Sequence, residues 1–166
     1  MITLICATNR VGSNSKKVAL LYQRILIERG VAFNFLALDE HNVVENGETF
    51  QDLQAKYLFP AEKFLFIMPE YNGSFPGILK LMIDQSDIRK AWHFKKAMLT
   101  GVASGRAGNL RGMEHFSGVA LYLKMNVHHN RLPISTVDKL LNSEGEITDE
   151  ATIAAVNAQI EDFLNF

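Results

Sequence analysis

The sequence predicts a doubly wound α/β domain, in which a five-stranded parallel sheet lies between two layers of helices. Short apolar runs such as Ile2–Ala7 lack polar alternation, which is typical of strands buried on both faces. Segments between these runs carry apolar residues at helical spacing, as Lys16–Arg29 does. Strands and helices alternate along the chain, and this alternation requires parallel pairing with right-handed crossovers.

Five strands and the helices between them follow from this pattern. The expected strands are Ile2–Ala7, Val31–Leu38, Lys63–Met68, Lys96–Ala103 and Asn126–Leu132. The expected helices are Lys16–Arg29, Ile78–Ser86, Leu110–Met125 and about Asp149–Leu164, with a polar connection at Val43–Leu58 that has room for a short helix. No internal repeat, low-complexity tract or long linker interrupts the chain, so we expect a single domain over residues 1–166.

The expected strand order is 2-1-3-4-5, which places the topological switch point between strands 1 and 3. Ligands of open α/β sheets bind at such a point, beyond the carboxyl ends of the strands. The loops that follow strands 1 and 3 begin at Thr8 and Pro69. We therefore expect these two loops to form a binding site together.

The loop Thr8–Ser15 has the composition of a phosphate-binding turn. Ser13 or Ser15 can cap the following helix and leave backbone N–H groups and the positive end of the helix dipole facing the loop, while Arg10 adds a charge. Helix capping alone would explain the serines equally well. The strand before the loop and the helix after it favour a ligand, and the short hydroxyl-rich turn suits a phosphate monoester better than a pyrophosphate. Neither a P-loop nor a Rossmann glycine pattern is present.

The loop after strand 3 presents Glu70, Tyr71, Asn72, Gly73 and Ser74 in succession. These groups can hydrogen-bond to a planar molecule and stack on it. For Tyr71, an aromatic side chain that packs at the base of the loop is the alternative interpretation. The loop by itself does not identify the molecule.

Three segments resemble the flavodoxin-like NADPH-dependent FMN reductase family, which also includes quinone, azo-dye and chromate reductases. Thr8–Ser15 is similar to the family's Gly-Ser-x-Arg-x-x-Ser-x-Asn loop. Pro69–Gly77 resembles its Pro-Glu-Tyr-Asn loop almost letter for letter, and Ser104–Gly112 resembles its Gly-Gly-x-Arg-Ala segment. The three segments occur in the family's order, so the resemblance implies a flavodoxin-like three-layer fold. The departures from the family pattern are Ala7, Thr8, Ser15, Asn109 and Gly112.

The resemblance also implies that the chain binds FMN. The phosphate would contact Thr8, Arg10, Ser13, Asn14 and Ser15; one edge of the isoalloxazine would follow Pro69, Glu70, Tyr71, Asn72 and Gly73; the other side would face Ser104, Gly105, Arg106 and Gly108. Arg106 and Arg111 are candidates for a contact to the anionic part of NADPH, although Arg111 could equally bind a loop carbonyl or Glu114.

The chemistry implied by the resemblance is hydride transfer from NADPH or NADH to FMN and on to a small-molecule electron acceptor. The acceptor could be free flavin, a quinone, an azo compound, a metal oxyanion or oxygen. Because the cofactor performs this chemistry and the protein positions the rings, we name no catalytic acid or base. The alternative is a noncatalytic FMN-binding electron carrier or redox-sensing interaction module, and a third possibility is a flavin-free descendant that keeps only the fold. The formal net charge of −1 argues against a strongly acidic electron carrier.

Composition bears on three further questions: binding to nucleic acid or membranes, the cellular compartment, and metal binding. The near-neutral charge and the lack of a basic run exclude nonspecific binding to nucleic acid or to an anionic membrane surface. The single cysteine, Cys6, cannot form an internal disulfide, and neither a signal peptide nor an apolar stretch of membrane-spanning length is apparent, so we expect a cytoplasmic protein. His128 and His129 are adjacent in an expected strand, where their side chains would point to opposite faces, so we expect no metal site.

The family resemblance further implies a homodimer or homotetramer. Phe75, Trp92 and Phe94 lie near the second and third loops and are expected to offer apolar surface to another subunit.

Overall fold

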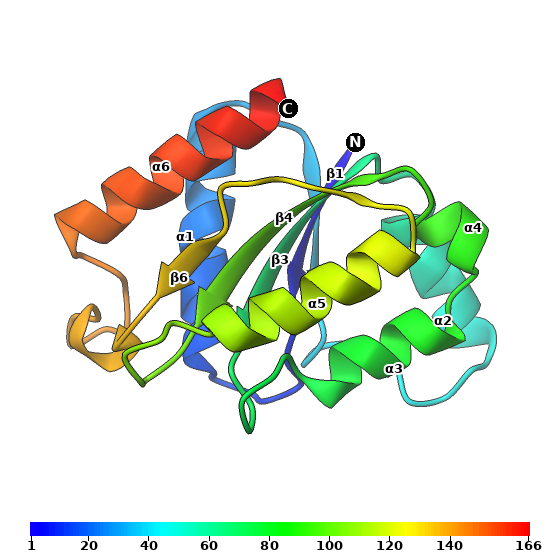
Figure 1. Ribbon diagram of the computed structural model, residues 1–166, viewed down its shortest axis with the longest axis horizontal. Helices are drawn as coiled ribbons and strands as arrows, with labels where there is room; N and C mark the ends of the chain where they lie inside the picture. Colours follow the sequence, from blue (N-terminus) through cyan, green and yellow to red (C-terminus); the bar gives the residue numbers. More distant parts are fainter.

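The computed structural model describes residues 1–166 and contains a parallel sheet covered by helices on both faces (Figure 1). The sheet order is β2-β1-β3-β4-β5, and an additional short strand, β6, also pairs with β4. This confirms the predicted fold class and strand order. The strands are β1 (Ile2–Cys6), β2 (Phe33–Ala37), β3 (Lys63–Pro69), β4 (Lys96–Val102), β5 (Asn126–Val127) and β6 (Leu132–Ile134).

The helices form two layers. On one face lie α1 (Asn14–Glu28) and α6 (Glu150–Asn165), and on the other lie α2 (Glu48–Leu53), α3 (Gly77–Gln85), α4 (Ile88–Ala91) and α5 (Leu110–Tyr122). The expected short helix in the polar connection is α2, which continues as one π-helical turn, η1 (Gln54–Leu58). A 3-10 turn, η2 (Val137–Lys139), follows β6. No helix of the structure is both long enough and apolar enough to cross a membrane.

Alternate residues of β1, β2, β3 and β4 pack into two separate apolar clusters, one on each face of the sheet. Leu4 and Cys6 of β1 pack with residues of α1 and α6, whereas Ile5 and Ala7 pack with residues of α2 to α5. Burial of both faces explains why the strands are apolar without alternation. Trp92 belongs to the second of these clusters: it is fully buried, and its indole N–H donates to the Ser86 hydroxyl at 2.6 Å. The expectation that Trp92 forms subunit-facing surface is therefore wrong, whereas Phe94 is 73% exposed.

The expected fifth strand is split in two. Val127 pairs with Ala97 and Leu132 with Thr100, so the four residues 128–131 lie opposite only two residues of β4. The extra residues loop out of the sheet edge, and the amide of Gln159 bridges the gap by donating to the carbonyl oxygens of Leu99 (3.1 Å) and Asn130 (2.8 Å).

The split also corrects the histidine prediction. His128 and His129 lie in the looped-out segment, where their ring centroids are 4.5 Å apart, so their side chains do not point to opposite faces. His128 is buried, and burial, followed by the neighbouring His129 charge, lowers its pKa. No three histidine, cysteine or carboxylate side chains gather in a metal-binding group.

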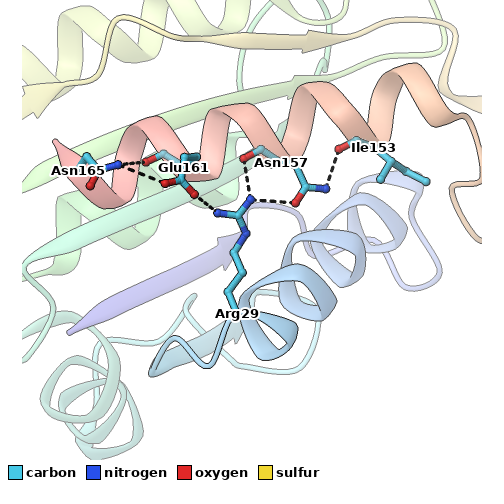
Figure 2. A network of polar contacts seen from close by, with 5 residues as sticks. All are labelled: Arg29, Ile153, Asn157, Glu161 and Asn165. Carbon is cyan, nitrogen blue, oxygen red and sulfur yellow. Dashed lines mark hydrogen bonds and ion pairs between the residues drawn. The ribbon is translucent and has the colours of Figure 1, made fainter.

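Polar contacts hold α1 against α6. Figure 2 shows Arg29, which follows α1, donating to the backbone and side-chain oxygens of Asn157 at 3.3 and 3.0 Å and pairing with Glu161. Deeper in the same interface, the fully buried Tyr22 hydroxyl is 2.8 Å from the Thr100 hydroxyl and donates to Gln159. These contacts orient α1 and α6 on the face of the sheet opposite α3 and α5. The loops described next lie at the carboxyl ends of β1, β3 and β4.

Candidate functional site

A cavity of about 280 Å³ lies at the carboxyl ends of β1, β3 and β4, where the loops after these strands meet. This is the predicted switch point of the sheet. Larger hollows occur on the outer surface, including one of about 480 Å³ between α3 and α5, but they lie away from the strand ends. The cavity at the strand ends is lined by Arg10, Val11, Ser13, Asn14, Ser15, Pro69, Glu70, Tyr71, Val102, Ala103, Ser104 and Val137.

The first loop has the donors that an anion requires. Ser13 is the N-cap of α1, and its hydroxyl accepts from the Lys16 N–H at 3.2 Å, so Ser13 rather than Ser15 caps the helix. The backbone N–H groups of residues 11–15 donate to no acceptor in the chain, and Ser15 is buried at the cavity. Arg10 has no carboxylate partner. Free N–H groups at a helix N-terminus next to an uncompensated cation have the chemistry needed to bind a phosphate group.

Tyr71 joins the second loop to the first. Its hydroxyl lies 2.5 Å from the hydroxyl of Thr8, which is completely buried, and the guanidinium carbon of Arg10 lies 4.0 Å from the centre of its ring. The cation and the aromatic face attract each other at this distance. The side chain of Tyr71 thus lines the cavity and links the two loops, which is more than packing at the base of its own loop.

The second loop is a tight hairpin. Tyr71 and Ser74 exchange two backbone hydrogen bonds of 2.9 and 3.1 Å, with Asn72 and Gly73 at the tip at φ of 51° and 78°. Both positive φ values are those of a type I′ turn, for which Asn-Gly is the preferred pair. The N–H groups of Glu70 and Tyr71 are used inside the chain, by the carbonyls of Val102 and Ser74, so the free donors of this loop are those of Asn72 and Gly73.

Two side chains of α5 support the hairpin from outside. A Cβ placed on Gly73 would lie 3.0 Å from Nη1 of Arg111, and the Ser74 hydroxyl is 3.0 Å from Nδ1 of His115. Arg111 does not pair with Glu114, because that carboxylate binds Arg131 at 2.6 Å. The guanidinium of Arg111 therefore lies over the hairpin tip without an acidic partner.

The third segment contributes less to the cavity than the sequence predicts. Ser104 lines it, but Gly105, Arg106 and Gly108 do not. The carbonyl of Gly105 accepts from Thr136, and that of Arg106 accepts from the Ser135 hydroxyl, so both residues anchor the segment after β6. Gly108 is needed for packing: a Cβ there would lie 2.7 Å from Cβ of Pro133. Asn72 and Gly73 also lie outside the lining, at the hairpin tip.

Some lining residues have no motif that identifies them. Val102 is the last residue of β4 and Ala103 follows it, and Val137 comes from η2, a turn close to α1 only in the folded chain. Asp138 of the same turn accepts from the Asn14 side chain at 2.6 Å. Strand-end position could have indicated Val102 and Ala103, but no sequence signal indicates Val137.

Lys16, which follows the first loop, differs from Arg10 in that its charge is already paired. Lys16 lies 2.6 Å from carboxylate oxygens of both Asp39 and Glu40, so it is not a free cation for a ligand. Hydrogen bonds to these carboxylates raise the pKa of Lys16. Burial, reinforced by Asp39, raises the pKa of the Cys6 thiol to about 12, so this cysteine is an inert core residue at neutral pH.

An open parallel sheet with a cavity at its switch point is the arrangement in which doubly wound α/β proteins bind their ligands. A sequence model of the NADPH-dependent FMN reductase family matches residues 1–138. The chain belongs to this family. The family resemblance predicted from the three segments is thereby confirmed.

The chain is similar to two curated proteins over part of its length. It is 27% identical to an NAD(P)H-dependent FMN reductase of Pseudomonas aeruginosa over 104 residues, or 61% of this chain and 56% of that protein. It is 28% identical to a 2-hydroxy-1,4-benzoquinone reductase of a Burkholderia species over 96 residues, or 55% of this chain and 52% of that protein. The chain spans about half the length of these relatives.

A solved structure shares the whole fold. The flavoenzyme NAD(P)H:(acceptor) oxidoreductase FerB of Paracoccus denitrificans superposes with a TM-score of 0.80, covering 99% of this chain and 94% of that chain at 20% identity. At this identity the likeness concerns the fold, and it is consistent with the flavodoxin-like fold predicted from the sequence.

Proposed function

We propose that this chain is an FMN-dependent NAD(P)H oxidoreductase, which takes hydride from NADPH or NADH and passes electrons to a small-molecule acceptor. The observation that carries the proposal is the first loop, where the free N–H groups of residues 11–15 and the unpaired Arg10 meet at one end of the cavity. This donor set fits a phosphate monoester such as that of FMN. FMN, when bound, supplies a ring that accepts hydride and gives two electrons to an acceptor.

The chain's own residues would bind and orient that ring. Arg10, Ser15 and the N–H groups of the first loop would hold the phosphate, and Pro69, Glu70 and Tyr71 would border one side of the ring. The link between Tyr71 and Thr8 would hold the phosphate loop and the ring-side loop at a constant separation. Ser104 and the small Ala103 would allow a planar ring to approach the backbone from the other side. The proposed site needs no acid or base, because the protein acts by positioning.

We propose a quinone as the first acceptor to test, because one relative is named a 2-hydroxy-1,4-benzoquinone reductase. Free flavin, azo compounds, metal oxyanions and oxygen belong to the same proposal as competing acceptors. We further propose that the protein works as a homodimer or homotetramer, since Phe94, Leu121 and Tyr122 leave 66–79% of their surface exposed on the side of α4 and α5.

The test is an anaerobic titration. The purified protein is loaded with FMN, freed of excess flavin and mixed with NADPH or NADH, and the absorbance of oxidised flavin is followed in a stopped-flow instrument. Bleaching on mixing, followed by reoxidation with benzoquinone in a ping-pong pattern, is the expected result. Flavin that binds but is reduced only when a separate reductase is added would contradict the enzyme and favour an electron carrier. A protein that binds no FMN would contradict the proposal altogether.

A further inference from the structure

Asn109 occupies an unusual position between the third loop and α5. It is completely buried and adopts the left-handed backbone conformation, with φ 63° and ψ 30°, directly after Gly108 at φ 54°. Asparagine tolerates this conformation better than most residues, but glycine would adopt it at lower cost. A requirement for backbone conformation alone therefore does not explain an asparagine here.

The side chain of Asn109 binds the end of β3. Its Nδ2 donates to the carbonyl oxygens of Met68 and Pro69, at 3.0 Å each. Two acceptors on one side fix the orientation of the amide, because only its NH₂ group can face them. The Oδ1 atom points the other way and is buried without a hydrogen-bond partner. An amide kept in place despite an unsatisfied oxygen indicates that the two contacts of its nitrogen matter.

Two glycines make room for this side chain. A Cβ on Gly112, in the first turn of α5, would lie 2.0 Å from Oδ1 of Asn109. A Cβ on Gly101, in β4, would lie 2.2 Å from the carbonyl oxygen of Gly108 and 2.9 Å from Cβ of Asn109. Glycine inside a helix lowers helix stability relative to alanine, so Gly112 is explained by the space that Asn109 needs.

The end of β3 is paired with β4, in the register Met68–Gly101 and Pro69–Val102, whereas its pairing with β1 ends at Ile67. Pro69 has no N–H group to donate to the sheet, and the next backbone bond is from the Glu70 N–H to the Val102 carbonyl at 2.9 Å. From this point the chain runs into the cavity-lining loop of Pro69, Glu70 and Tyr71. The two hydrogen bonds of Asn109 therefore lie where the chain leaves the sheet and enters this loop.

We propose that Asn109 is a positioning residue for the flavin: its amide fixes the Met68–Pro69 end of β3 and thereby holds the Glu70–Gly73 loop at the distance from the ring that binding requires. The inference rests on the proposed function and goes beyond it, because Asn109 lies outside the cavity lining and departs from the family pattern. Its effect on the cofactor would be transmitted through the backbone of the loop.

Two variants test the proposal. Asn109→Gly keeps the left-handed backbone and removes the amide, and Asn109→Asp keeps the shape but replaces the donating NH₂ by an oxygen. The matched control is Gln159→Leu, because Gln159 is also fully buried and donates from one amide to two backbone carbonyls, those of Leu99 and Asn130, on the face of the sheet that carries α6. All three variants lose stability, so melting temperature alone does not distinguish a positioning role.

The readouts that do distinguish it are the dissociation constants of oxidised and reduced FMN and the hydrogen exchange rate of the Glu70 amide. For both Asn109 variants we expect at least a tenfold weaker binding of oxidised FMN, at least a threefold change in the ratio of the two constants, and at least tenfold faster exchange at Glu70. For Gln159→Leu we expect each of these quantities to stay within twofold of the natural chain at a similar loss of melting temperature.

Flavin constants within twofold of the natural chain for both Asn109 variants would overturn the proposal, as would an equal effect of Gln159→Leu. A failure of the proposed function is recognised separately, because the natural chain itself would then bind no FMN, and the positioning role would fall with it.

Discussion

Replacing Arg10 by glutamine should weaken FMN binding by removing the single cation at the phosphate end of the cavity. Arg10 lies on the ring of Tyr71 at 4.0 Å and has no carboxylate partner, so the substitution leaves no buried acid unpaired. A hydrogen bond to a charged group contributes about 1.5–3 kcal/mol. Because about 1.4 kcal/mol corresponds to a tenfold change in affinity, the dissociation constant of FMN should rise by about 10- to 100-fold.

The assay is fluorescence quenching of FMN and, in parallel, of riboflavin, which lacks the phosphate. The affinity for riboflavin should be nearly the same in the natural chain and in Arg10→Gln. Arg106→Gln is the matched control, because Arg106 carries the same charge on an exposed loop outside the cavity lining. This variant should bind FMN as tightly as the natural chain does. An unchanged FMN constant in Arg10→Gln, or an equal loss for riboflavin, would refute the assignment of the phosphate to this loop.

Three further predictions follow from particular contacts. Tyr71→Phe removes the 2.5 Å contact between the hydroxyls of Tyr71 and Thr8, so the unfolding free energy should fall by about 1 kcal/mol. The release of FMN, measured by stopped flow, should become faster, and an unchanged release rate would contradict the link between the two loops. Tyr22→Phe removes a hydroxyl from the buried contact with Gln159 and should lower the unfolding free energy in urea by about 1–2 kcal/mol without altering the FMN constant. Burial lowers the pKa of Lys95 from 10.5 to about 8. Between pH 8 and pH 10.5 the unfolded chain therefore holds a proton that the folded chain has released, so the unfolding free energy should rise with pH in this range. Lys95→Met should flatten that slope in denaturation curves measured at several pH values, and an unchanged slope would assign it to other groups.

The fold was predictable because most of its determinants are local. The apolar run at Ile2–Ala7 and the helical spacing in Lys16–Arg29 reflect burial of two faces of a strand and one face of a helix, which does not depend on the identity of the partner. The sequence did not predict that the expected strand Asn126–Leu132 would divide. That outcome depends on register against β4, where four residues face two, and register is a property of the pair of strands.

The candidate site was predictable to the extent that it is made of contiguous loops. Residues of Thr8–Ser15 and Pro69–Tyr71 meet at one cavity, as the strand order requires. Gly105, Arg106 and Gly108 were expected there by analogy of motif, but their backbone anchors the segment after β6 instead. A motif indicates the type of loop, but it does not indicate which residues of the loop face the cavity. That depends on the segments that pack against the side of the loop away from the cavity.

The sequence alone determined the family, the doubly wound topology and the two loops that carry the proposed ligand chemistry, because each is encoded in neighbouring residues. Only the tertiary structure decided that Trp92 belongs to the core, that Tyr71 reaches Thr8 across the switch point, and that Val137 lines the cavity. The tertiary structure also decided that Asn109 hydrogen-bonds to the end of β3, in the space left by Gly101 and Gly112. These contacts join residues that are far apart along the chain, and the distance between such residues is set only when the layers pack.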